Sequence, residues 1–154
     1  MNEEAVRKDV LVAFEYSYLH ADWVNPLEEA LAGVTVEDAL WSPSPDSMNI
    51  WRIVLHLAVW NENMVQRIET GEKSRPEEGA WPPLPAVQDE AAWETSKKRL
   101  WDAEESLRTT IASVPWEKIQ NSPYGLPDLL CRITHNGYHL GQITKLRECM
   151  ASKA

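Results

Sequence analysis

The chain has 154 residues, enough for one domain with a single hydrophobic core and too few for two. Hydrophobic residues make up 44% and charged residues 25%, a balance typical of a folded globular domain and not of a disordered chain. The net charge is −9, and lysine and arginine form no cluster, so we expect no nucleic-acid partner and no anionic membrane surface as partner.

No run of apolar residues approaches the ~18 of a membrane-spanning helix, so no span of a bilayer is expected. The first ten residues, MNEEAVRKDV, are charged throughout and do not resemble a secretory signal. Two cysteines, Cys131 and Cys149, are too few for a disulfide scaffold. We therefore expect a cytoplasmic protein in a reducing compartment.

The first segment with helical periodicity runs from about Glu3 to Leu31. Pro26 interrupts it, and two alternatives stay open: a kink, or a restart with Asn25 as the cap and Pro26 in the first turn. One broad face of this segment carries Val6, Val10, Phe14, Tyr18, Ala21, Val24, Leu27 and Leu31.

A short turn of helix is expected at Thr35–Leu40, where Thr35 and Asp38 have the spacing of a capping box. The second long helix is expected to begin near Ser47 and to end at Gly71, a residue suited to closing a helix. Its predicted core face comprises Ile50, Ile53, Val54, Leu57, Met64 and Ile68. A separate polar stripe comprises Asn49, Arg52, His56, Trp60 and Asn63.

The connection from Glu72 to Gln88 is unusually long for a helical bundle, and it contains four prolines and Trp81. This proline-rich composition predicts a stiff connection. It can cross the bundle from end to end, which leaves the second and third long helices parallel, or it can cap one end.

The third long helix is expected after Asp89, and the fourth from Leu126–Pro127 to about Met150. Along the third, mostly apolar residues recur at spacings of three and four: Trp93, Ser96, Leu100, Ala103, Leu107, Ile111 and Val114. No strand pattern of useful length appears. The sequence therefore predicts an all-α fold, a four-helix bundle of helices about 20 residues and about 30 Å long, in a single domain over residues 1–154.

Two of the four histidines lie four residues apart on the fourth helix. This spacing places His135 and His139 one turn apart on one side, where two imidazoles can converge on one ion. Gln142 continues their stripe, which also holds Asp128, Cys131 and Leu146. The predicted apolar stripe lies roughly opposite and comprises Leu129, Leu130, Ile133, Gly137 and Leu140. Taken alone, a spacing of four residues is more typical of two surface histidines than of a metal site. His56 adds a third ligand only if the second and fourth helices are neighbours.

Three stretches together resemble the DinB/YfiT-like superfamily of metalloenzymes: DWVNPLEEALAGVTVEDALWSPSPDS, MNIWRIVLHLAVWNENMVQRIETG and LPDLLCRITHNGYHLGQITKLR. The resemblance covers nearly the whole chain, and a histidine on the second helix with HxxYHxGQ on the fourth is its most specific feature. It implies a four-helix bundle, commonly dimeric, in which three histidines hold a divalent ion, nickel or zinc. The ligands then fall on His56, His135 and His139, and His20 matches none of them.

Three neutral imidazoles leave at least one position of Zn²⁺ or Ni²⁺ open. A water there has its pKa lowered towards ~7, and a thiol binds as the thiolate. The resemblance also implies a low-molecular-weight thiol as a candidate co-substrate, because relatives use such thiols in transfer or isomerisation. We therefore predict a metal-dependent hydrolase or thiol-dependent transferase acting on a small molecule. The alternatives are a non-catalytic metal-binding or dimerising bundle and a binding protein without metal.

Five residues are candidates for lining a substrate pocket: Asn49, Arg52, Trp60, Tyr138 and Gln142. Gln142 and Tyr138 lie close enough to orient a ligand, although a helix-packing hydrogen bond is an equal alternative for Gln142. Arg52 suits an anionic substrate, but a surface salt bridge is the favoured interpretation. No general base stands out, since Glu62 lies off the stripe of His56 and Asp128 is about 10 Å along the helix from His135.

Cys131 lies one turn before His135, where a fourth ligand is conceivable and a small buried thiol is favoured. Gly137 and Gly141 weaken the fourth helix and indicate close approach of another helix. Because the polar stripes lie away from the apolar faces, a second subunit can cover them, and we expect a two-fold homodimer. The alternative is a monomer whose histidine cleft is open to water.

Overall fold

The computed structural model describes residues 2–21 and 25–152, and within them the chain is all-helical. The four long helices are α1 (Glu3–Tyr18), α4 (Ile50–Thr70), α5 (Glu90–Ser113) and α7 (Gly125–Ala151). The short ones are α2 (Leu27–Leu31), α3 (Val36–Leu40) and α6 (Trp116–Gln120). The predicted all-α class is confirmed for the described residues. No helix among them is long and apolar enough to span a membrane.

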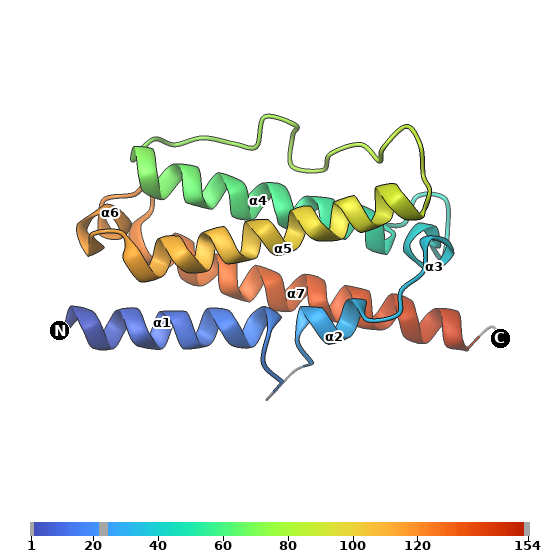
Figure 1. Cartoon of the computed structure of the whole chain (residues 1–154), viewed down its shortest axis with the longest axis horizontal. Coiled ribbons are helices and arrows are strands. Elements are labelled where there is room, and N and C mark those ends of the chain that lie inside the picture. Colours follow the sequence, from blue (N-terminus) through green and yellow to red (C-terminus); the bar gives the residue numbers. More distant parts are fainter. Residues whose placement is uncertain (1, 22–24, 153–154) are drawn as a thin grey trace.

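The long helices lie side by side, with α1 and α7 running in one direction and α4 and α5 in the other (Figure 1). α4 packs along α5 and also against α7, while α1 contacts both α5 and α7. Side chains from all four helices fill the space between them, and the buried rings of Trp51 and Trp93 lie 5.2 Å apart. The contact between α4 and α7 brings the two helices that carry the site histidines together.

The first predicted helix is too long. α1 ends at Tyr18, and α2 is a separate helix with Pro26 at its N-cap. The restart is therefore the correct alternative, although Pro26 and not Asn25 occupies the cap. Its fixed φ suits entry into the new helix. Ala21, expected on the buried face, is exposed, and Val24 lies outside the described residues.

The helix ends follow local sequence signals. Thr35 and Asp38 form the predicted capping box before α3, in which each side chain accepts from the other's backbone N–H. The side chain of Asn49 accepts from the backbone N–H of Arg52 at 2.9 Å and starts α4. Gly71 closes α4 with a φ of 72°, a left-handed conformation that favours glycine. α4 therefore has well-defined ends, which fix the turn that carries His56.

The connection between α4 and α5 runs back along the length of both helices, so these helices are parallel (Figure 1). Two arginines hold it in place. Arg99 on α5 binds Glu78 in the connection at 2.6 Å and Glu62 on α4 at 2.7 Å. Arg67 on α4 donates to the carbonyl oxygen of Ser74. Of the two predicted paths, the structure shows the crossing one.

The predicted apolar stripe of α7 is partly wrong. Leu130 is 44% exposed, whereas Arg132 and Asn136 are buried at 4% and 1%. These polar side chains enter the core because it supplies their partners. Arg132 Nε donates to Asn61 Oδ1 at 2.5 Å, and Asn136 Nδ2 donates to Glu104 Oε1 at 3.2 Å. A pattern based on hydrophobicity cannot identify a core face built from polar pairs.

Two further expectations need correction. Among the described residues, no atom outside the helix's own backbone and the adjoining residues lies within 4 Å of a Cβ built at Gly137 or at Gly141, so no described helix packs closely there. The five-residue helix α6 was not predicted, and it begins directly after Pro115, where a proline with its fixed φ suits entry into a helix.

Candidate metal centre

Three histidines from two helices converge at one point. His56 Nε2 on α4 lies 3.0 Å from His135 Nε2 on α7, and His139 Nε2 lies 3.0 Å from the same atom. The three rings offer nitrogen atoms that all lie within 4.8 Å of one another. Two ligands that share an ion at about 2.1 Å lie at most about 4.2 Å apart, and both separations from His135 Nε2 meet this limit. The structure thus brings the three predicted ligands together, while their binding of an ion stays a prediction.

Oxygen acceptors orient two of the rings. The backbone carbonyl oxygen of Ala80 accepts from His56 Nδ1 at 2.5 Å, and Gln142 Oε1 accepts from His139 Nδ1 at 2.7 Å. These contacts place the proton of each neutral ring on Nδ1, so that the Nε2 lone pairs of both rings face the common point. Gln142 Nε2 in turn donates to the hydroxyl of Tyr138 at 2.9 Å, which fixes the amide.

The third ring has a different neighbour. Arg132 Nη1 contacts His135 Nδ1, and a guanidinium group only donates. His135 Nδ1 must therefore accept, which leaves the proton of this neutral ring on Nε2, between the nitrogens of His56 and His139. To bind an ion through Nε2 as a neutral ring, His135 would have to carry its proton on Nδ1, so Arg132 would have to turn away from that atom.

All three histidines titrate below the ordinary range. Burial, together with the positive charge of Arg132, lowers the pKa of His56 to about 4 and that of His135 to about 3. Burial also lowers the pKa of His139. The three rings are therefore neutral at pH 7, the state in which imidazole binds a metal. Imidazole nitrogen suits Zn²⁺ and Ni²⁺, so this donor set fits the implied ion.

Aromatic rings surround the histidines. Trp81 in the connection stacks on His56, with ring centroids 3.7 Å apart and planes inclined by 16°. Trp60 meets His56 edge-on at 6.3 Å, and Tyr138 meets His139 at 5.0 Å. Ala80 and Trp81 were missed as site residues because their contacts depend on the path of the connection. A tryptophan within a proline-rich segment was the available signal.

A recess of about 200 Å³ lies beside the centre, between α4 and α7. His135 contributes to its wall together with Trp60, Met64, Arg67, Asp128, Cys131 and Arg132. Of the predicted pocket residues, Trp60 lines this recess, whereas Tyr138 and Gln142 lie beside His139. Asn49 is occupied in capping α4, and Arg52 lies one turn before His56. The recess gives the centre an adjoining volume for a small molecule.

The carboxylates considered as general bases are both engaged. Glu62 accepts from Arg99, and Asp128 accepts from Arg67 at 3.0 Å. The cysteine prediction is wrong, since Cys131 is exposed and lines the recess instead of packing as a buried thiol. His20 is also exposed. Its ring lies 6.0 Å from that of Tyr16, and it does not belong to the group of three histidines.

Comparison with known proteins gives one match. A model of the DinB superfamily matches residues 19–143, a range that includes all three histidines of the centre. No curated protein and no solved structure matches the chain significantly.

Proposed function

The chain belongs to the DinB superfamily, and from this membership together with its histidine centre we propose that it is a divalent-metal-dependent enzyme acting on a small molecule. The reaction we propose is hydrolysis or transfer involving a low-molecular-weight thiol. The observation that carries the proposal is the convergence of three neutral imidazoles beside a recess. Three protein ligands leave room for a water or a substrate, which distinguishes catalytic from structural zinc sites.

We propose that His56, His135 and His139 hold Zn²⁺ or Ni²⁺. Such an ion lowers the pKa of a bound water or thiol and so supplies a nucleophile near neutral pH. The carbonyl of Ala80 and the amide of Gln142 orient the rings, and Trp81 covers the centre on the side of the connection. The recess then receives the rest of the substrate.

The test uses protein purified without chelators or nickel resin and then loaded with Zn²⁺ or Ni²⁺. The proposal predicts hydrolysis of p-nitrophenyl acetate, or transfer of cysteine thiol to 1-chloro-2,4-dinitrobenzene, above the rate of the metal-free protein. His139→Ala should remove the gain, and His20→Ala, at an exposed histidine outside the centre, should keep it. Equal gains in the two variants, or none in the wild type, would contradict the proposal.

The alternative, a dimerising bundle, also has an observation in its favour. Tyr138 is 63% exposed and Leu130 is 44% exposed on α7, and Gly137 and Gly141 on the same helix have no close neighbour among the described residues of other elements. We propose that this face meets a second copy in a homodimer, with or without catalysis. Light scattering decides this, because a mass near 17.6 kDa contradicts the dimer and twice that mass supports it.

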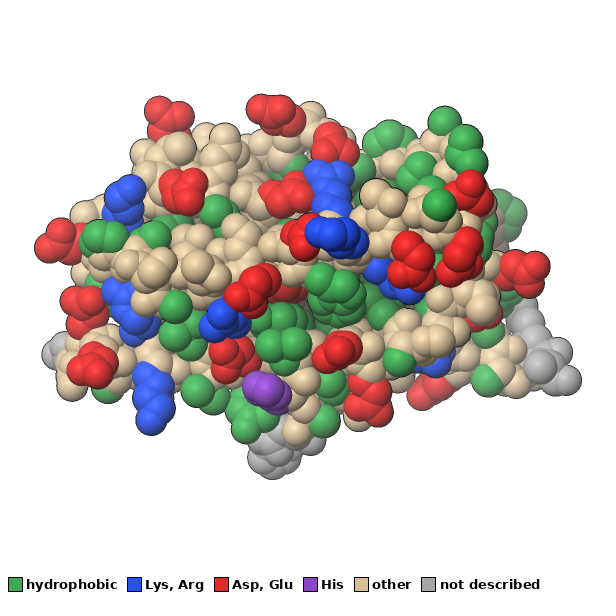
Figure 2. All heavy atoms as spheres, in the orientation of Figure 1, with side chains coloured by type: hydrophobic (Ala, Val, Ile, Leu, Met, Phe, Trp, Pro, Cys, Tyr) green, Lys and Arg blue, Asp and Glu red, His purple; other side chains and the backbone are tan. Residues whose placement is uncertain are grey.

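We further propose that the long helices form a four-helix bundle of the DinB type and that the protein works in the cytoplasm. Free Cys131 and Cys149 support a reducing compartment. On the face seen in Figure 2, acidic side chains are spread widely with basic ones between them. This distribution and the net charge of −9 support a small-molecule substrate over nucleic acid.

A further inference from the structure

Two buried arginines and one carboxylate lie in the wall of the recess beside the histidine centre. Arg67 and Arg132 line it and are only 7% and 4% exposed, and Asp128 is the one carboxylate in its described wall. The hydrogen bonds of Arg132 go to neutral acceptors: Asn61, the carbonyl of Leu57 and His135. Glu104, which is not part of this wall, is the counter-charge of Arg132, so Arg67 is the arginine of the recess that we consider as a partner for a ligand.

We propose that this recess is the substrate subsite of the centre and that it binds the carboxylate of a small anionic molecule, with Arg67 as its partner. The inference rests on the proposed function, because it assigns the recess to a substrate whose reacting end lies at the histidines. It adds the chemical class of the substrate and the residue that recognises it.

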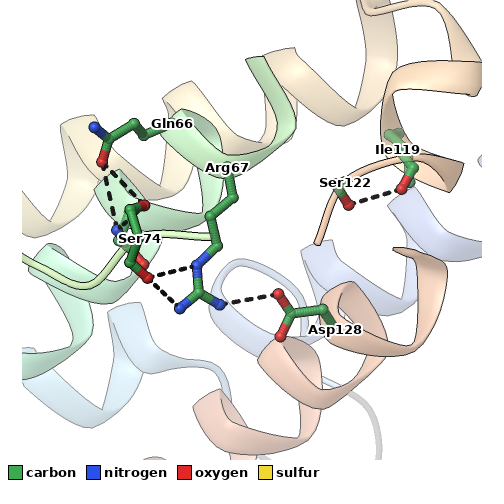
Figure 3. A network of polar contacts seen from close by, with 7 residues as sticks. Gln66, Arg67, Ser74, Ile119, Ser122 and Asp128 are labelled. Carbon is green, nitrogen blue, oxygen red and sulfur yellow. Dashed lines mark hydrogen bonds and ion pairs between the residues drawn. The ribbon is translucent and has the colours of Figure 1, made fainter. Parts of the chain in front are cut away.

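Arg67 is held ready for such a ligand. Its Nε and Nη2 donate to the carbonyl oxygen of Ser74 at 3.1 and 2.6 Å, and its Nη1 donates to Asp128 at 3.0 Å (Figure 3). The ring of Trp60 lies 5.6 Å from its guanidinium carbon. These bonds use three of the five N–H groups and leave two without an acceptor among the described residues. A fixed guanidinium loses little side-chain freedom when it binds a carboxylate.

The remainder of the wall suits a short hydrocarbon segment. Trp60 and Met64 provide apolar surface, and His135 lies in the same wall as Arg67. The recess, at about 200 Å³, is smaller than the roughly 300–1,000 Å³ of a typical pocket for a drug-sized ligand. The substrate part that enters is therefore small, a carboxylate on a chain of a few carbons.

The test compares three thiols that differ at one end: 3-mercaptopropionate, 3-mercaptopropionamide and the cationic cysteamine. Each is titrated into cobalt(II)-loaded protein in a buffer free of carboxylate and phosphate, and the absorption of the cobalt–thiolate complex gives the Kd. We expect the carboxylate to bind at least about tenfold more tightly than the amide, and cysteamine to bind most weakly.

Two variants assign the preference to Arg67. Arg67→Gln should bind the carboxylate and the amide equally, whereas Asp128→Asn should increase the preference because it removes a competing carboxylate. The gain in Asp128→Asn cannot arise from impaired folding. Arg99→Gln is the matched control, since Arg99 also anchors the connection but contacts Glu62 and Glu78 and does not line the recess. It should keep the wild-type ratio.

The outcomes separate this inference from the proposed function. A chain that takes up no cobalt(II) overturns both. A chain that takes up cobalt(II) but binds no thiol, or binds carboxylate and amide equally, overturns the inference and leaves the metal centre standing. A carboxylate preference that survives in Arg67→Gln also overturns it, because the preference then comes from another charge.

Discussion

Two buried polar clusters meet at Arg132, and they differ in how their groups are satisfied. In the core cluster, Glu104, Arg132, Asn61 and Asn136 supply donors, acceptors and opposite charges to one another. In the histidine centre, three like neutral rings direct nitrogen atoms at a single point. The groups of the first cluster are paired largely with one another, with Asn61 Nδ2 and Asn136 Oδ1 left without a hydrogen-bond partner among the described residues, whereas we propose that the second cluster binds an ion.

Because of this difference, the two clusters are expected to affect the stability of the protein in different ways. Removing one member of a balanced buried pair leaves an uncompensated charge, which is costly. A group of converging neutral donors adds stability chiefly when its ligand binds, because ligand binding to the folded state alone favours folding. We therefore expect substitutions in the core cluster to lower the stability of the metal-free protein most, and substitutions in the centre to act through metal binding.

The largest expected effect is in the core cluster. Glu104→Ala should lower the free energy of unfolding by about 3–5 kcal/mol, because it leaves the guanidinium of Arg132 buried without its counter-charge. Urea denaturation of the metal-free protein measures this. Glu105→Ala is the neighbouring control, at an exposed glutamate paired with Arg108, and should cost no more than about 1 kcal/mol. Similar losses in the two variants would show that the core cluster is not balanced as described.

The next effect is stabilisation by metal. Zn²⁺ at about 100 times its Kd should stabilise the wild type by about 2.7 kcal/mol and raise Tm accordingly. His139→Ala should lose this shift, and His20→Ala should retain it. A shift of the same size in His139→Ala would assign zinc binding to another site. Thermal denaturation with and without Zn²⁺ provides the comparison.

A smaller effect is expected from the group that orients His139. Gln142→Ala should weaken zinc affinity by about 10- to 100-fold, because Gln142 Oε1 no longer fixes the Nδ1 proton. Competition with a zinc-sensitive chelator measures the Kd. Gln120→Ala, at an exposed glutamine on α6, is the control. An unchanged Kd in Gln142→Ala would reduce its role to packing within α7.

A further effect is a change in the pH dependence of stability without metal. The pKa values of His56 and His135 are about 4 and 3 in the folded chain and 6.5 without these surroundings, so the unfolded chain binds more protons below pH 6.5. Their contribution to stability is present above pH 6.5 and is lost as the pH falls through about 4. His56→Gln should reduce the change in the free energy of unfolding between pH 6.5 and pH 4, and His20→Gln should leave this change as it is in the wild type. Parallel curves for wild type and His56→Gln would contradict the neutral state of the buried ring.

The sequence predicted the features that depend on local chemistry. The capping box at Thr35, the end of α4 at Gly71 and the buried face of α4 follow from caps, φ preferences and helical spacing. The spacing of His135 and His139 placed both rings on one side of α7. The family resemblance is confirmed by the superfamily match over residues 19–143.

The remaining features depend on contacts between distant segments. Arg132 and Asn136 were absent from the predicted core because their partners lie on α4 and α5. The roles of Ala80 and Trp81 depend on the path of the connection across α4. Cys131 was expected to be buried because its environment was inferred from residue type alone. The hydrogen-bonded partners in the first two cases lie between 24 and 71 residues apart along the chain.

The central claim is that His56, His135 and His139 bind one divalent ion through their ring nitrogens. X-ray absorption spectroscopy at the zinc edge, on protein loaded with one equivalent of Zn²⁺, tests it directly. The account predicts about three imidazole nitrogens at about 2.0–2.1 Å, and one fewer in His56→Ala. A shell that contains sulfur at about 2.3 Å, or only oxygen atoms, would contradict it.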